Sequence, residues 1–538
     1  MTMDKRLHLA LAMLMVCSAS CVQLQPERFA DYVAPAGSLS EAGRSDASST
    51  APAHEAATTP GTLMLGVTDA VILSLRHNKA FVVEQFNPAI RRTFEQQELA
   101  LFDPVLSWQI AHTRSRSPSL AGPLQTRTAT TAFVDVSQFF PTGTDVSVRA
   151  RTALRRPETS SSGESALELS VTQSLLRGLG VDVNLATLRQ ARLDIEASQY
   201  ELRGFAEALV AQVEQAYWDY VLAHRQIQIV EASLDIATRQ LNETNERIRV
   251  GALAKAESAA ARSEAALRQE DLINARSNVE TSRLRLLRLV NPQVPAFWQT
   301  KLVLTDQPAT QPGELDSVDD LVRVSMLLRP ELNQARLAVK AGDLEIVKTR
   351  NGLLPRLDAF ASFAKTGFGR TLGGSLGDMT DEGHEVTVGI SGDYPIFNRA
   401  PRARDYRAHL ARDQAAAAVA NLEQLVEVDV RTAYELVQRF AAQIEATGAT
   451  VEAQGETVRV EQGRFGQGVS TLLDLSRARR DLLTSQLAHV QAQVNYIKAI
   501  VDLHRVDGSL LTRRGIAAPG DRPVDFASSK QARFAEDR

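Results

Sequence analysis

The sequence has 538 residues, enough for several domains, and a net charge of −4. This charge gives no strong attraction to nucleic acid or to an anionic membrane surface, so no nucleic-acid partner is expected. Its two cysteines are Cys17 and Cys21, so the chain beyond residue 21 has no disulfide and no thiolate metal site.

Residues 1–20 are typical of a signal peptide: a basic start, a short apolar run and then small residues. Cys21 follows the small residues and is a candidate for lipidation, although Ser18 and Ser20 also suit an ordinary signal peptidase. Residues 21–66 form a lead segment rich in Ala, Ser and Pro that we expect to be loose. No later apolar run reaches the ~18 residues of a membrane helix, so a membrane span would have to use β-strands.

A first structural repeat is predicted at residues 67–295. It begins with a helix from about Thr68 to Leu101, which Pro104 ends. Between residues 104 and 173 apolar and polar residues alternate, which predicts strands of roughly 7–10 residues. Such strands suit a transmembrane wall and a soluble antiparallel sheet equally. A helical hairpin follows at 185–290, with a long helix to Val250 and a return helix from about Ala254.

The pattern recurs at residues 317–511, after a connector at 296–316. The second repeat has a helix from Asp320 to Gly352, a β segment at 355–396 and a helical hairpin at 402–510. We interpret the Gly-rich stretch 367–377 as a mobile outer loop rather than a phosphate-binding loop. Residues 512–538 form a polar tail that we expect to be loose.

The two hairpins are related by an offset of 217 residues. In the second hairpin one apolar residue recurs every seven positions, which predicts a coiled-coil seam; these residues are Val430, Val437, Ile444, Val451, Val458 and Phe465. The same offset relates the turn glycines Gly468 and Gly251. From this constant offset we infer an internal duplication of the chain. A helix of about 65 residues is roughly 100 Å long and needs neighbours along its whole length, so self-association is expected.

These features together resemble the TolC family of outer-membrane efflux proteins, over about residues 68–511. The breaks at Pro104 and Pro355, the strand-to-helix returns Gln173–Leu176 and Tyr394–Phe397, and the Arg464-Phe465-x-x-Gly468 turn carry the resemblance. It implies a mainly α fold with membrane β: an internally duplicated α-barrel/β-barrel protomer of a trimeric outer-membrane channel with long coiled-coil-like helices. It also implies a homotrimer in outer-membrane lipid that works with a periplasmic adaptor protein and an inner-membrane pump.

The implied function is passive export of small molecules or proteins, in a tripartite efflux or type I secretion system, with helices reaching into the periplasm. No cofactor, metal or enzyme activity is expected, because the sequence has no catalytic or metal-binding constellation. The alternative is an exported coiled-coil envelope lipoprotein with a structural or partner-binding role. Family members usually have four strands per protomer, whereas the first β segment here is long enough to hold four by itself. Two alternatives follow: a barrel larger than usual, or an extra hairpin that lies outside the barrel.

Two sets of candidate site residues lie near the hairpin turns. Arg247, Gly251, Arg464 and Gly468 frame the turns and are candidates for adaptor docking; the alternative is that they only shape the turns. Asp474 and its equivalent Glu257 are predicted about two turns into the return helices. The resemblance implies an acidic ring at a periplasmic gate, and the alternative is a solvated helix face. The polar Ser476 and Arg480 interrupt the apolar register, so we expect the weakest packing there.

Overall fold

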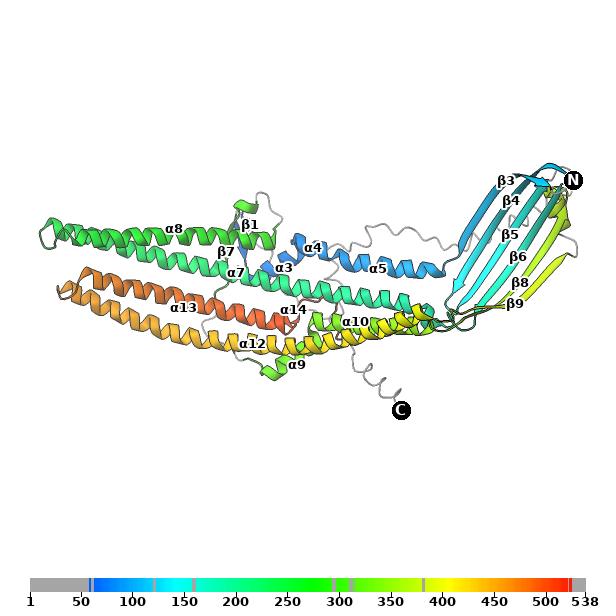
Figure 1. Ribbon diagram of the computed structural model, residues 1–538. Coiled ribbons are helices and arrows are strands. Elements are labelled where there is room, and N and C mark those ends of the chain that lie inside the picture. Colours follow the sequence, from blue (N-terminus) through cyan, green and yellow to red (C-terminus); the bar gives the residue numbers. More distant parts are fainter. Residues whose placement is uncertain are drawn as a thin grey trace, which may run out of the picture.

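The computed structural model describes residues 58–59, 62–119, 122–156, 161–292, 297–308, 313, 315–379, 383–520 and 522–524. Its shape is elongated, with long helices side by side and a sheet at one end (Figure 1). The predicted signal peptide, Cys21 and most of the lead segment lie outside the described residues. No helix in the described part is long and apolar enough to cross a membrane.

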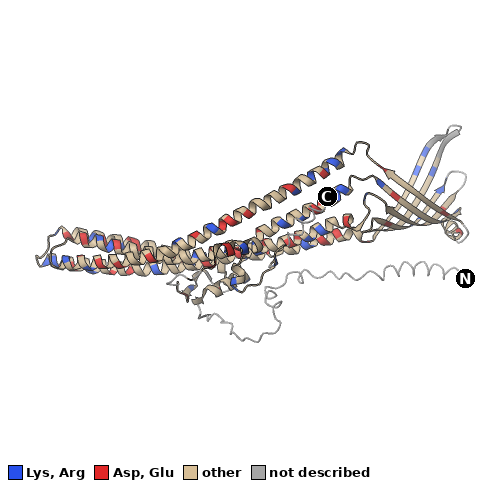
Figure 2. Cartoon of the chain, turned by 90° about the horizontal axis from the view of Figure 1, so that it is seen from below, with Lys and Arg blue, Asp and Glu red and all other residues tan. Residues whose placement is uncertain are grey.

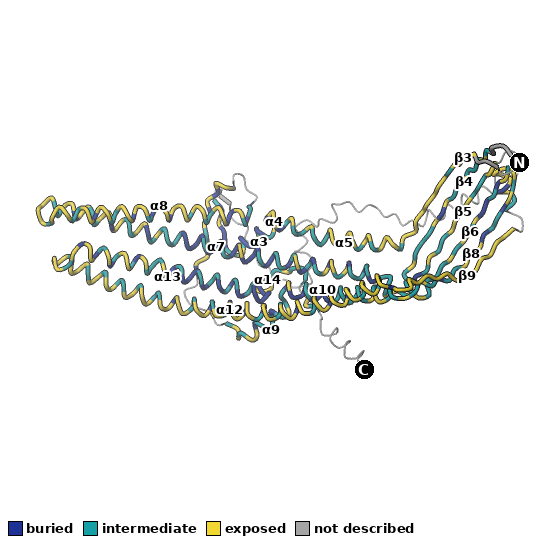
Figure 3. The backbone as a smooth tube through the Cα atoms, in the orientation of Figure 1, coloured by how far each residue is buried: buried dark blue, intermediate teal, exposed yellow. Residues whose placement is uncertain are grey.

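The longest helices form the two predicted hairpins. In the first, α7 (Ala186–Arg249, preceded by the short α6, Val181–Asn184) is followed by α8 (Glu257–Val290). In the second, α12 (Arg399–Gly466) is followed by α13 (Leu472–Val506) and the short α14 (Leu510–Arg513). The seam is most buried in the middle of the molecule, at Val430, Val437 and Ile444, and the tips are mostly exposed (Figure 3). Charged side chains of both signs are mixed along these helices (Figure 2).

The helix that opens each repeat is broken, which corrects the prediction of continuous helices. The first consists of α3 (Val67–His77), α4 (Lys79–Glu84), α5 (Phe86–Leu99) and a 3-10 turn η1 (Ala100–Phe102). The Asn78 side chain accepts hydrogen bonds from the amides of Ala80 and Phe81 and so starts a new helix. The second consists of α9 (Val318–Leu328) and α10 (Pro330–Asn351), because proline at a first helical position has no amide to continue the ladder.

A small sheet lies beside the middle of α7. It joins β1 (Thr58–Thr59), β2 (Thr62–Leu65) and β7 (Lys301–Leu304, after the 3-10 turn η2, Phe297–Gln299). Strand β2 belongs to the lead segment that was predicted to be loose, and this part of the prediction is wrong. Leu63 and Leu65 are buried, and the Tyr217 hydroxyl donates to the Leu65 carbonyl oxygen at 3.1 Å, because the strand covers the apolar side of α7.

The large sheet is antiparallel, with the order β3-β4-β5-β6-β8-β9. The first repeat supplies β3 (Val105–Ser119), β4 (Gly122–Phe140), β5 (Thr144–Arg156) and β6 (Ser162–Ser174). The second supplies β8 (Arg356–Gly369) and β9 (His384–Asp393). The strands have 10 to 19 residues, so the predicted length of roughly 7–10 was too short. The strands are longer because polar residues at their outer ends continue the backbone pairing beyond the last alternating apolar residue.

The Gly-rich stretch between β8 and β9 is not simply a loop. It contains a short helix, α11 (Leu372–Asp378), which the Thr371 side chain caps by accepting from the Gly374 amide. The helix packs on the strands: the Ser375 and Ser165 hydroxyls are 2.8 Å apart, and a side chain at Gly367 would collide with the Ser375 carbonyl. The glycines therefore allow close approach of helix and strand.

The described part of the C-terminal tail is held against the helices, contrary to the expectation of a loose tail. The buried Arg203 of α7 donates to the carbonyl oxygens of Gly508 (3.0 Å) and Gly520 (2.9 Å). Arg514 donates two hydrogen bonds, of 2.7 and 2.6 Å, to the buried Glu214 carboxylate. Residues 507–520 thus form a strap along α7. Its partners lie about 300 residues earlier in the chain, so local composition could not predict it.

Candidate functional site at the helical tips

The two hairpin turns have the same backbone geometry. Gly251 and Gly468 have φ angles of 77° and 73°. The amide after each glycine, of Ala252 or Val469, donates to a carbonyl five residues earlier, at 2.8 and 2.9 Å. This is the Schellman arrangement, in which a left-handed residue ends the helix. A Cβ at either glycine would meet no atom within 4 Å, so the backbone angle rather than space requires glycine.

The arginines that precede the turns pair locally and also join the tips. Arg247 pairs with Glu243 and lies over the Phe465 ring of the other hairpin, 5.8 Å from its centroid. Its equivalent Arg464 is 2.7 Å from Glu461, whose second carboxylate oxygen accepts from Ser470 at 2.7 Å. Exposed contacts of this kind contribute about 0–1 kcal/mol each. The tips are therefore held side by side by weak contacts.

Asp474 and Glu257 lie in the first turn of their helices, so their prediction about two turns in was wrong. Asp474 is the third residue of α13, and its carboxylate accepts from the Thr471 hydroxyl at 2.6 Å and from the Thr471 amide at 3.3 Å. This capping box lowers the pKa of the fully exposed Asp474 carboxyl, first through the Thr471 hydroxyl. Glu257 is the first residue of α8, which has no side-chain cap. The two acids therefore have different surroundings.

The arginines after Asp474 connect the two hairpins. The Arg479 guanidinium donates to the Gln240 side chain of α7 at 3.3 Å, and burial lowers its pKa. The Arg480 guanidinium is 3.4 Å from Glu264 of α8. Glu264 also accepts from the buried Arg268 at 3.0 Å. The sequence shows the spacing of Glu264 and Arg268 within one helix, but no sequence signal places Arg480 beside them.

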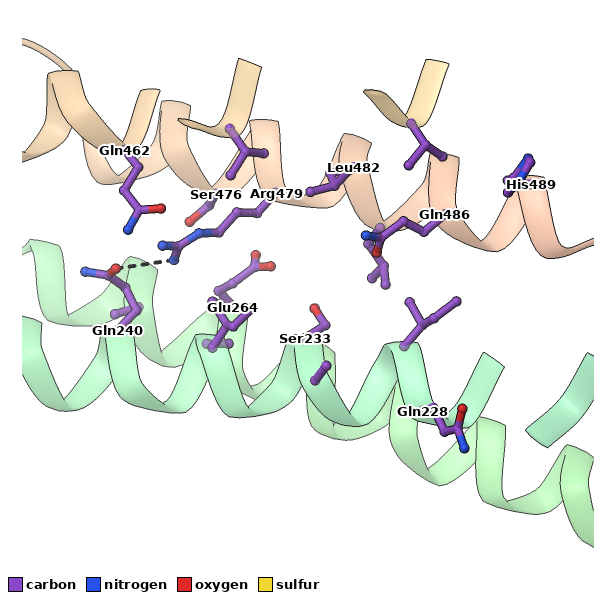
Figure 4. Close-up of a pocket in the computed structure, with 18 of the residues that line it drawn as sticks. Gln228, Ser233, Gln240, Glu264, Gln462, Ser476, Arg479, Leu482, Gln486 and His489 are labelled. Carbon is purple, nitrogen blue, oxygen red and sulfur yellow. Dashed lines mark hydrogen bonds between the residues drawn. The ribbon is translucent and has the colours of Figure 1, made fainter. Parts of the chain in front are cut away.

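A cavity of about 730 Å³ lies between the hairpins, just behind the tips. Figure 4 shows Gln240, Ser476 and Arg479 at one end of it, with Gln486 and His489 further along. Ser476 and the buried Leu472 both line the cavity, whereas Arg480 does not. Within the described residues, no group of three or more His, Cys, Asp or Glu is placed to hold a metal ion. The walls are mainly apolar, with glutamines, Ser476 and Arg479 among them, so the two hairpins are incompletely packed against each other here.

Comparison with solved structures gives the class of this fold. The outer membrane channel CmeC of Campylobacter jejuni superposes with a TM-score of 0.62 over 87% of this chain and 88% of its own, at 15% identity. The outer-membrane channel OprN gives 0.63 over 82% and 89%, at 18% identity. The fold is thus that of a channel protomer with a helical barrel and a β domain.

The family follows from the sequence itself. The model of the outer membrane efflux protein family matches residues 113–291 and 321–509, which is more than half of the chain, so the protein belongs to this family. The outer membrane protein TolC of Escherichia coli is 24% identical over 339 residues, 60% of this chain and 66% of TolC, slightly less than two thirds of that relative. The alkaline protease secretion protein AprF of Pseudomonas aeruginosa is 24% identical over 61% of this chain and 70% of its own.

The family consists of channel proteins rather than enzymes. Its TolC-type members are homotrimers of the outer membrane that work with periplasmic adaptor proteins and inner-membrane pumps. The protein is accordingly an outer-membrane protein whose helical part extends into the periplasm. The predictions of family, fold class and location are confirmed, and the alternative of a structural coiled-coil lipoprotein is not favoured.

Proposed function

We propose that this chain forms the outer-membrane exit duct of a tripartite export system, through which cargo passes without chemistry in this protein. The observation that carries the proposal is the placement of two equivalent hairpins at one end of a molecule whose other end is a sheet with an apolar face. One copy supplies too few helices to enclose a lumen, so three copies complete the duct. Relatives named for efflux and for protease secretion leave the cargo open.

The channel function is tested by single-channel recording of the purified protein in a planar bilayer. We expect discrete conductance steps that need no nucleotide, because the duct itself is passive. A folded protein that gives no conductance at any voltage would contradict the proposal.

The tips are proposed as the docking surface for the adaptor. They are the far ends of the long helices, and their duplicated glycine turns expose backbone and small side chains to a partner helix. Val250 and Val469 are 70% and 66% exposed at these turns, so they offer apolar contact area. Arg247 and Arg464 would flank that contact.

Substitution of the turn glycines tests docking. Gly468→Val places a β-branched residue at a positive φ and should distort the turn, whereas Gly468→Asn tolerates this angle and serves as the matched control. We expect the valine variant to reach the outer membrane but to lose cross-linking to the adaptor from position 469, and the asparagine variant to keep it. Equal cross-linking by both variants would show that the turn does not dock.

The acids near the tips are proposed as part of a periplasmic gate. Three copies of Asp474 around an axis would form a ring of carboxylates, which favours cations over anions. Within one copy the Thr471 hydroxyl lowers the pKa of the Asp474 carboxyl, which favours its charged form. Glu257 would add a second, weaker set of charges at the equivalent position of the first hairpin.

A further inference from the structure

The strands β4 and β5 have no counterpart in the second repeat. Pro104 before β3 corresponds to Pro355 before β8, and Gln173 at the end of β6 corresponds to Tyr394 after β9. In the second repeat β8 and β9 pair directly with each other. The first repeat has the hairpin of β4 and β5 between the equivalent strands, so this hairpin is an insertion.

The inserted hairpin lies in the middle of the first repeat's strands and continues their ladder. Val136 of β4 pairs with Leu106 of β3 and with Val148 of β5, and Val148 pairs with Leu169 of β6. Directly paired residues share one face of a sheet. This row of apolar pairs therefore runs from β3 through the hairpin to Val386 of β9, with Val388 and Ile390 on the same face; Lys365 of β8 is on that face one row nearer the outer end.

The opposite face carries paired polar residues on the same strands, beside Phe133 of β4 and Phe360 of β8. Asp135 of β4 accepts from Arg149 of β5 at 3.1 Å, and Arg151 of β5 lies 3.5 Å from Glu164 of β6. Ser137 and Ser147 form another pair on this face. An apolar face towards lipid and a polar face towards water are what a membrane wall requires. The hairpin meets this requirement as well as its neighbours do.

The sheet ends in two free edges, β3 and β9, within the described residues. Trp108 on β3 and Val388 on β9 are 71% and 77% exposed on the apolar face. Because six antiparallel strands alternate in direction, β3 and β9 run oppositely, so β9 of one copy can pair antiparallel with β3 of the next. Such a head-to-tail contact between identical copies forms a ring when the rotation from one copy to the next closes. A second copy of this chain is thus the partner that fits each edge.

We propose that the inserted hairpin is part of the channel wall, so that three copies with six strands each close a wall of eighteen strands. The inference rests on the proposed trimeric channel. Wall diameter grows roughly in proportion to strand number, so the outer part of the duct is about 1.5 times as wide as with four strands per copy. Walls of 16–18 strands enclose an aqueous channel, which suits bulky hydrated cargo.

Thiol labelling of neighbouring residues tests whether the hairpin is in the wall. Ser137→Cys and Ser147→Cys lie on the polar face, and Val136→Cys and Val148→Cys are their matched neighbours on the apolar face. In outer-membrane vesicles a water-soluble maleimide should label the first pair and leave the second unlabelled, with the unsubstituted chain as background. On β3, Ser107→Cys should label and Trp108→Cys should not.

The outcomes separate the two proposals. One outcome is that labelling alternates between the two faces of β3 but is equal on both faces of the hairpin. It would overturn the proposal of an eighteen-strand wall and leave the proposal of a membrane channel standing. Loss of alternation on β3 as well would overturn the membrane wall itself. As a second measurement, Ser107→Cys combined with Thr387→Cys or Ser391→Cys should join copies covalently up to a trimer in at least one register. No joined copies with any combination would contradict edge pairing.

Discussion

At the scale of single residues, Asp474 has two separable roles. Its carboxylate caps α13 through Thr471, which is a structural role, and its charge is proposed to contribute to a ring at the gate. Asp474→Asn removes the charge. We expect weaker cation preference and weaker block by divalent cations, measured as reversal potentials and block in planar bilayers.

Thr471→Ala is the matched control for this change. It removes the same cap, at a cost of about 1 kcal/mol in helix stability, but keeps the Asp474 charge. Selectivity should therefore be unchanged in this variant. If Asp474→Asn and Thr471→Ala shift selectivity equally, or neither does, the charge of Asp474 does not act on the permeating ions.

At the scale of elements, the contact between Arg480 of α13 and Glu264 of α8 holds the hairpins together beside the cavity. Arg480→Gln breaks this contact and leaves the pairing of Glu264 with Arg268 in place. Because such a pair contributes up to about 1 kcal/mol in each copy, we expect the open fraction in single-channel records to rise by up to about fivefold for each copy that must open.

Arg276→Gln serves as the control, since Arg276 of α8 pairs with Glu231 of α7 within one hairpin, at 3.9 Å. It should leave the open fraction unchanged. An increase of the same size in both variants would mean that general loosening, rather than separation of the hairpins, opens the channel.

The strap along α7 gives a pH-dependent prediction at the same scale. Burial raises the pKa of the Asp507 carboxyl from 3.8 to about 6; Arg513 opposes and Asp316 adds to the shift. One carboxylate oxygen accepts from the Ser509 amide at 2.7 Å, and the other has no partner among the described residues. Because the folded state holds the proton more tightly, this stabilisation is present below pH about 4 and lost as the pH rises through about 6.

Asp507→Asn should remove this dependence. Between pH 4 and 6 the wild-type strap should lose roughly 1–3 kcal/mol of stability relative to the variant. Hydrogen exchange of the strap amides measures the difference. Parallel pH profiles for the two proteins would show that Asp507 does not titrate with folding of the strap.

The sequence predicts those parts of the fold that repeat or follow a period. The predicted end of the first long helix, at Val250, lies within one residue of the observed end, because a glycine stop is a local signal. The helix breaks at Asn78 and Pro330 were not predicted from the sequence, because the apolar spacing is the same before and after each break. The strap through Arg203 and the contact of Arg480 with Glu264 depend on residues far apart in the chain, which local patterns do not bring together.

At the scale of the whole molecule, the protein has one long helical part and one large sheet. The helix α7 has 64 residues, so the helical part is about 100 Å long. Its apolar seam is buried between helices, whereas the apolar face of the sheet is exposed and needs lipid. Three copies would therefore place a single lipid belt around the sheet and leave the helices in water.

Electron microscopy of the purified protein in detergent tests this arrangement most directly. We expect a threefold particle with one detergent belt around the sheet end and a hollow rod of about 100 Å projecting from it, with the tips farthest from the belt. Single rods without threefold symmetry, or a belt around the helices, would contradict it.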